Sequence, residues 1–292
     1  MPSRIAVAGI VAFWLAVTAY VTYRDVWPRL FATGPPPVSI ELSDEAKQNI
    51  PARWTIYRGP HKIGRLTTQM KYRDTDDTFQ FTYQYSDLEL EQGGVVLKVP
   101  SATSDVRMTR EGDLKEQSMT AKVKATYRDV EVATGTIDVK GVVRNEVLTG
   151  RAELKSNFLD VAADLDPVPV PHGGQPLNPL QPVNRLGSVR GGQQWIVHES
   201  NPLGEALGEL VRKTLAERGI RLKEQPKKES AVAEVGGSPQ ILVWQAQEVA
   251  CWVIEYRRAE PFARTWVRTA DGKVLRQEAF EGGESLVFER ED

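Results

Sequence analysis

The chain has 292 residues, and its 37 Lys and Arg residues nearly balance its 39 Asp and Glu residues, which leaves a formal net charge of −2 at pH 7. A balance of this kind provides no positive field for nucleic acid or for an anionic membrane surface, so we expect no nucleic-acid partner. The only cysteine, Cys251, excludes an intrachain disulfide and a cysteine-rich zinc site. It lies in an apolar run, which predicts a small buried side chain rather than a reactive thiol.

An uncharged run from Ile5 to Tyr23 stands almost at the N-terminus. As a helix it would cover roughly 28 Å, close to the hydrocarbon thickness of a bilayer. The aromatic group Tyr20, Tyr23 and Trp27 suits a membrane–water interface, which favours a retained anchor over a cleaved signal peptide. The position of the run is typical of an export signal. We therefore expect a single-pass protein of the inner (cytoplasmic) membrane, with its domain on the periplasmic or extracellular side.

The sequence divides into three parts. Residues 1–28 are the predicted membrane anchor, residues 29–52 a spacer, and residues 53–292 a β-rich domain. Consecutive prolines at 35–37 favour a stiff, extended spacer. A proline-rich loop at 166–190 interrupts the domain, because its prolines exclude a helix or a paired central strand there.

Alternating residues dominate the domain. Phe79, Phe81, Tyr83 and Tyr85 alternate with polar side chains, so a strand would place all four rings on one face. Further strands are predicted at 95–99, 119–127, 130–143, 147–155, 241–247, 249–257, 263–269, 273–280 and 285–289. Asp271-Gly272 predicts a two-residue hairpin loop in which both residues take positive φ.

One helix is predicted outside the anchor, from Leu203 to Arg218. Pro202 fits its first turn and Gly219 follows its end. Its apolar stripe should pack on the sheet through Leu207, Leu210 and Val211. The predicted fold is thus mainly β: a single N-terminal transmembrane helix, then a curved antiparallel sheet or half-barrel with one major packed helix.

Signals of chemistry are few. His61, His172 and His198 stand alone, without the spacing of a metal site, and Asp74, Asp76 and Asp77 fit a solvated turn. The chain carries no phosphate-binding loop, dinucleotide fingerprint or nucleophile elbow. We therefore predict a protein without enzymatic activity, cofactor or metal ligands.

Aromatic side chains on predicted strands are more informative. If the sheet curves more strongly than one helix can fill, an apolar trough is left that suits a lipid or another apolar ligand. The candidate lining residues are Phe79, Phe81, Tyr83, Tyr85, Trp252 and Trp266.

Two segments carry a family resemblance: the opening hairpin from Arg53 to Tyr72, and the closing strands from Ala263 to Phe280. In this pattern the chain resembles the exported lipoprotein carriers, the LolA/LolB-like superfamily. The resemblance implies a curved antiparallel sheet that wraps around helices and shelters acyl chains, with no catalytic residues to carry over. The chain departs from that family by its anchor, its missing lipidation cysteine and its long proline loop. A tethered protein cannot shuttle across the periplasm.

Three functions follow from these patterns. The first is a membrane-anchored extracytoplasmic protein that binds lipid or another apolar ligand in its curved sheet during envelope assembly. The second is a scaffold that recruits a protein partner through the proline-rich loop and the sheet edges. The third is a hydrolase whose site is not visible in the sequence. An exposed ridge from Pro176 to Arg185 would favour the scaffold, and a polar cleft gathering Asp, Glu or His would favour the hydrolase.

Overall fold

The computed structural model describes residues 13–14, 17–18, 20, 50–92, 94–109, 112–128, 130–157, 160–170, 182–187, 189–197, 201–217, 231–281 and 284–292. Most of the predicted anchor and spacer, and part of the proline-rich loop, lie outside these residues. Within them, no helix combines the length and the apolar character needed to cross a bilayer.

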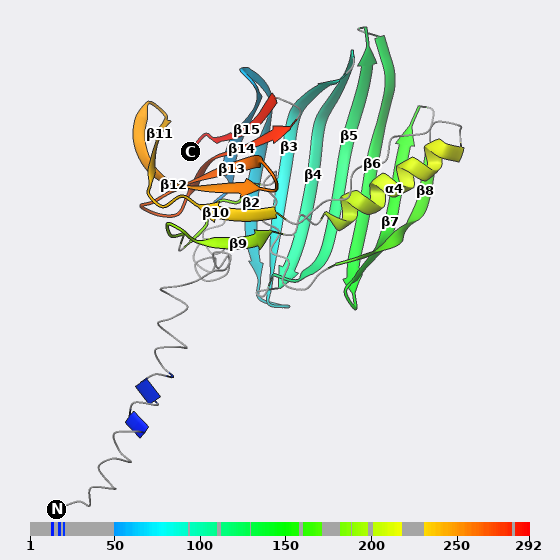
Figure 1. Ribbon diagram of the computed structural model, residues 1–292. Coiled ribbons are helices and arrows are strands. Elements are labelled where there is room, and N and C mark those ends of the chain that lie inside the picture. The colour runs from blue at the N-terminus through cyan, green and yellow to red at the C-terminus, as the bar shows by residue number, and fades with distance from the viewer. Residues whose placement is uncertain are drawn as a thin grey trace, which may run out of the picture.

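A meander of long strands forms the first half of the domain (Figure 1). Each strand pairs antiparallel with the next, because short turns join them. The strands are β1 (Ala52–Arg58), β2 (His61–Arg73), β3 (Thr78–Gln92), β4 (Val95–Thr109), β5 (Leu114–Tyr127), β6 (Val130–Arg144), β7 (Val147–Ser156) and β8 (Asp160–Pro169). The edge strand β8 reaches Pro169, so the proline-rich loop begins later than predicted; an edge strand tolerates these prolines.

The second half of the domain returns to the first. Its strands are β9 (Gln194–Val197), β10 (Ala231–Val235), β11 (Gln240–Trp244), β12 (Gln247–Arg257), β13 (Pro261–Arg268), β14 (Val274–Glu281) and β15 (Glu284–Arg290). The last strand, β15, pairs with β1, where Arg290 lies opposite Trp54. The described strands therefore form one open antiparallel sheet with β8 and β9 at its two ends. The mainly β, antiparallel prediction is confirmed.

The main core lies between the two halves of this sheet. In Figure 1, β9 to β15 turn in front of the first strands. Trp54, Phe81, Ile254, Tyr256 and Phe288 belong to one buried cluster that joins them. The indole Nε1 of Trp54 donates to Thr68 Oγ1 at 3.0 Å, so this buried donor is paired.

A single helix, α4 (Pro202–Glu217), covers one end of the sheet. Asn201 caps it, because its Oδ1 accepts the backbone N–H of Gly204 at 3.1 Å. Leu203, Ala206, Leu207 and Leu210 pack on β6, β7 and β8. The predicted contacts of Leu207 and Leu210 are confirmed. Val211 is only half-buried and lies outside this cluster, because the helix turns Leu203 and Ala206 to the sheet instead.

The turn between β13 and β14 differs from its prediction. Residues 269–273 join the strands, and of the pair only Gly272 has positive φ, at 71°. The Asp271 carboxylate shapes the turn with its side chain: it accepts from Arg268 Nε at 2.8 Å and from the backbone N–H of Lys273 at 3.2 Å. The prediction of a two-residue loop with positive φ at both residues is therefore wrong.

Candidate ligand-binding face

The four aromatic rings of β3 lie on one face of the sheet, as their alternation predicts. Phe79, Phe81 and Tyr83 are buried in the main core, and the half-buried Tyr85 packs against it. Burial raises the pKa of the Tyr85 phenol to about 12 and that of Tyr83 further, so both stay neutral at physiological pH.

The two tryptophans of the predicted lining are separated. Trp252 packs at the margin of the main core. Trp266 belongs to a different cluster with Leu242, Trp244 and Cys251. Cys251 is fully buried as predicted, and burial raises the pKa of its thiol to about 11. The structure thus brings five of the six predicted residues to one cluster and leaves Trp266 outside it.

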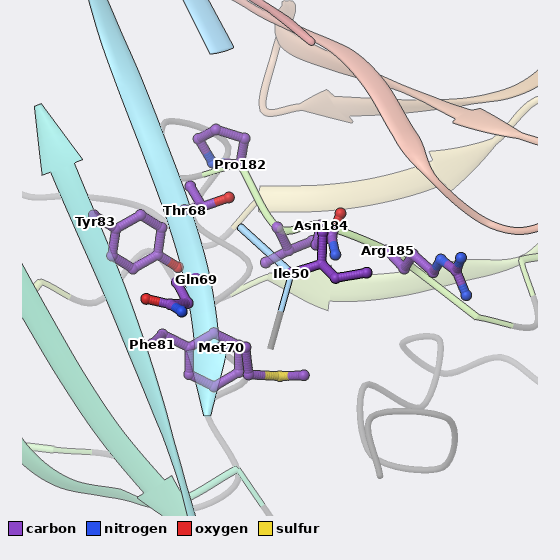
Figure 2. Close-up of a pocket in the computed structure, with 10 residues that line it drawn as sticks. Ile50, Thr68, Gln69, Met70, Phe81, Tyr83, Pro182, Asn184 and Arg185 are labelled. Atoms are coloured by element: carbon purple, nitrogen blue, oxygen red, sulfur yellow. The ribbon is translucent and has the colours of Figure 1, made fainter. Parts of the chain in front are cut away.

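The end of the proline-rich loop covers the β3 rings. We call residues 182–187 the strap. Pro182 and Leu186 are buried, and Pro182 and Asn184 line one pocket together with Tyr83 and Phe81. Figure 2 shows the Arg185 side chain extending away from these two rings. Backbone hydrogen bonds fix the strap to the β13–β14 turn: Leu186 N–H donates to Gly272 O at 2.9 Å, and Val274 N–H donates to Asn184 O at 3.1 Å.

The space left between the strap and the rings is small. Its volume is about 30 Å³, and its lining residues are Ile50, Thr68, Gln69, Met70, Phe81, Tyr83, Pro182, Val183, Asn184 and Arg185. A volume of this order corresponds to about one water molecule. Ligand binding at these rings therefore stays a prediction that would require the strap to move.

A larger apolar surface lies on the same face, beyond the rings. The alternation of β3 shifts by one position at Asp87, whose φ is 53°, while the pairing of β3 with β4 keeps a single register. Leu88 and Leu90 therefore follow the rings on the inner face, and Leu88 packs against the main core. Leu90 lies opposite Leu97, and Leu97 lies opposite Ala125. The row continues to Ala133 in β6, because Ala125 pairs with it.

We call this surface the open apolar face. It comprises Leu88, Leu90, Leu97, Val99, Val123, Ala125, Ala133, Ile137 and Leu154, all half-buried apart from the buried Val99. Ile137 lies opposite Leu154 and packs at the margin of the cluster under α4. In Figure 1, β4, β5 and β6 extend well past α4. The open apolar face therefore spans the region between the main core and the helix.

The opposite face of these strands is charged. Along the strands, the exposed residues Glu89, Lys98 and Lys124 alternate with the residues of the open apolar face. Lys98 Nζ lies 3.2 Å from a carboxylate oxygen of Glu89. Apolar and charged residues alternate along a strand in this way when one face of the sheet is in contact with water and the other face is covered by apolar atoms. Since α4 contacts β6, β7 and β8, the half-buried apolar rows of β3, β4 and β5 form a candidate surface for a ligand.

A second, polar depression lies where β1, β2 and β3 end. It has a volume of about 1120 Å³. Its lining residues with ionisable side chains are Arg58, His61, Lys62, Arg65, Asp87, Glu89 and Glu91. Among the described residues, no hydrogen bond joins His61 to a carboxylate, although a working acid–base pair requires about 2.6–3.2 Å between its partners. The depression thus gathers His61 with Asp87, Glu89 and Glu91 from separate strands, which is the kind of cleft that the hydrolase alternative requires, but no acid–base pair is formed among these described residues.

Comparisons with known proteins add little. No family model matches the chain, and no curated protein matches it. One solved structure with similarity is a β-barrel-like protein of a domain of unknown function, DUF1849, from Brucella abortus. The two sequences are 12% identical, the alignment covers 82% of this chain and 94% of that one, and the TM-score is 0.34. A likeness at this level supports no inference about function.

Proposed function

We propose that this protein binds a lipid or another long apolar ligand on the open apolar face. The observation that carries the proposal is the cross-strand row Leu90–Leu97–Ala125–Ala133, which is apolar, half-exposed and backed by charges on the other side of the sheet. Small side chains at Ala125 and Ala133 leave room for a ligand to approach the strands. The open antiparallel sheet with its one packed helix supports the proposal.

Apolar burial supplies enough free energy for such a complex. A chain-like ligand that hides ~300 Å² of apolar surface gains several kcal/mol at about 25 cal/mol per Å², before the entropic costs of binding. Directional hydrogen bonds are not required, since the face presents aliphatic side chains. Binding and handing over such a ligand needs no catalytic residue.

The proposal includes the membrane and the compartment. Ile5 to Tyr23 holds the protein in the inner membrane as a single span, with the domain on the periplasmic side. There the domain receives an apolar ligand during envelope assembly. The scaffold alternative uses the proline-rich loop and the sheet edges. Of the ridge from Pro176 to Arg185, the described residues 182–185 do not form an exposed surface: Pro182 is buried and Val183 is half-buried against the core.

Neighbouring residues on opposite faces of β4 provide a matched test. Leu97 belongs to the open apolar face, and Val96 points to the charged face opposite Glu91. Affinity for a fluorescent long-chain fatty acid is measured on residues 40–292 by titration. Leu97→Asn should weaken binding about tenfold, because about 1.4 kcal/mol of apolar contact is lost. Val96→Asn should leave it unchanged. No binding by the unsubstituted domain, or equal losses in both variants, would contradict the proposal.

A further inference from the structure

Exposed apolar side chains gather where β4, β5 and β6 meet at one end of the sheet. Val95 is 38% exposed, Tyr127 43%, Val130 64% and Val132 46%. Three of them are neighbours across the strands, because Tyr127 lies opposite Val95 on one side and opposite Val130 on the other. Val132 follows Val130 by two positions in β6. We call these four residues the tip. Isolated exposed apolar residues need no explanation, whereas a cluster at the end of a hairpin pair does.

The tip continues the open apolar face. Val95 precedes Leu97 by two positions in β4, and Tyr127 follows Ala125 by two positions in β5, so each pair shares a side of its strand. A ligand that entered at the tip would therefore stay against apolar side chains as far as Leu88 and Val99. This continuity connects the tip to the proposed function, on which the present inference rests.

The chemistry of the tip fits a bilayer better than a protein. The Arg128 guanidinium carbon lies 5.2 Å from the centroid of the Tyr127 ring. An aromatic ring with a polar end, beside an arginine that can extend to headgroups, is the composition favoured at membrane–water interfaces. A stable protein interface buries about 800 Å² on each partner. Four partly exposed side chains offer much less surface, but enough for shallow insertion.

The direction from which the chain enters the domain indicates which bilayer the tip can reach. The first strand residue, Ala52, lies opposite Thr68, and Thr68 lies opposite Tyr83 in β3. From Tyr83, β3 continues to Gln92 beside the tip, about 30 Å further at 3.3 Å per residue. From Ala52, β1 runs toward that same end, where Arg58 Nη1 donates to Glu91 O at 3.2 Å. The chain thus enters from the side away from the tip.

We propose that the tip docks on a second lipid bilayer, which faces the membrane that holds the predicted anchor. The stiff spacer expected from Pro35 to Pro37 would lift the domain away from its own membrane, with the tip pointing outward. The protein would then receive or deliver its apolar ligand at that second surface.

A vesicle-capture experiment tests this proposal. The full chain is reconstituted in vesicles, and capture of labelled protein-free vesicles of phosphatidylcholine and phosphatidylglycerol is measured by flotation. The unsubstituted protein should capture them, and Val130→Asp should reduce capture at least tenfold. Val243→Asp is the matched control, because Val243 is 68% exposed on β11 and lies outside the tip. Equal thermal midpoints of the three proteins check folding.

Each outcome separates the docking surface from the proposed ligand binding. Capture lost in both variants, or in neither, overturns the docking proposal. Absent capture together with normal fatty-acid binding overturns docking and leaves the proposed function intact. If Val130→Asp reduces capture but the protein binds no fatty acid, the docking proposal is supported and the proposed ligand binding is contradicted. Quenching of a fluorophore at position 130 by quencher lipids in the anchoring vesicles, and not by those in the second vesicles, also overturns the proposal.

Discussion

Leu90 of β3 and Leu97 of β4 lie directly opposite each other on the open apolar face. Both are half-buried, and the adjacent residues Glu89 and Lys98 form an ion pair on the other side of the same strands. This arrangement makes the two sides of the sheet chemically different at one position. It is the local basis for proposing an apolar ligand here.

The first prediction concerns the attachment of α4. Leu203 is buried against the sheet, so Leu203→Ala should lower the free energy of unfolding by about 2–5 kcal/mol through lost transfer energy and a cavity. Val211→Ala should cost clearly less, because Val211 is half-buried outside the cluster. Chemical denaturation measures both. Similar losses would show that the helix is held by a different set of side chains.

A second prediction tests the strap. Gly272 has a φ of 71°, and a Cβ there would lie 2.7 Å from the Leu186 carbonyl oxygen. Gly272→Ala should therefore combine about 1–2 kcal/mol of left-handed backbone strain with displacement of the strap. Gly192→Ala is the control, since its φ is 76° and its Cβ would meet nothing within 4 Å. The difference between the thermal midpoints of the two variants measures how much the docked strap contributes to stability. Identical shifts would mean that the strap adds nothing to stability.

Acid stability provides the third prediction. The hydrogen bond from Arg268 lowers the pKa of the Asp271 carboxyl below its ordinary value. A carboxyl with a depressed folded-state pKa stabilises the protein above its unfolded-state value of about 3.9, and that contribution is lost as the pH falls through the folded-state value. Asp271→Asn should reduce stability at pH 7 and lose less on acidification below about pH 4. Denaturation curves from pH 7 to pH 2 measure this; an unchanged acid limb would contradict it.

The fourth prediction concerns the topology proposed from the sequence. Alkaline phosphatase fused after Asp292 should be active, because the enzyme folds with its disulfides only in an oxidising compartment. A fluorescent reporter that needs the cytoplasm should be dark at the same position. The reverse pattern would place the domain in the cytoplasm and remove the envelope role.

Local patterns predicted the elements well and their assembly poorly. Leucine spacing located α4, and strict alternation placed the four rings of β3 on one face, because both signals lie within one element. The open apolar face was missed, since the left-handed backbone at Asp87 shifts the alternation of Leu88 and Leu90 by one position. No sequence signal marks the pairing of β15 with β1, whose partners lie at opposite ends of the domain.

The strap and the polar depression were missed for a related reason. The strap docks through backbone groups such as Leu186 N–H, which any residue except proline supplies. The depression collects side chains from 58–65 and 87–91, which become neighbours only after β2 pairs with β3. The proline content correctly predicted an irregular segment, but it did not predict that the strap packs in the core.

Photocrosslinking with a diazirine-bearing fatty acid tests the central claim most directly. The probe is bound to the protein, irradiated, and located by mass spectrometry of the resulting peptides. The open apolar face predicts adducts in residues 88–99 and 121–137, on side chains such as Leu97 and Ile137. Adducts confined to Phe79–Tyr83 and the strap, or no adducts at all, would contradict ligand binding on this face.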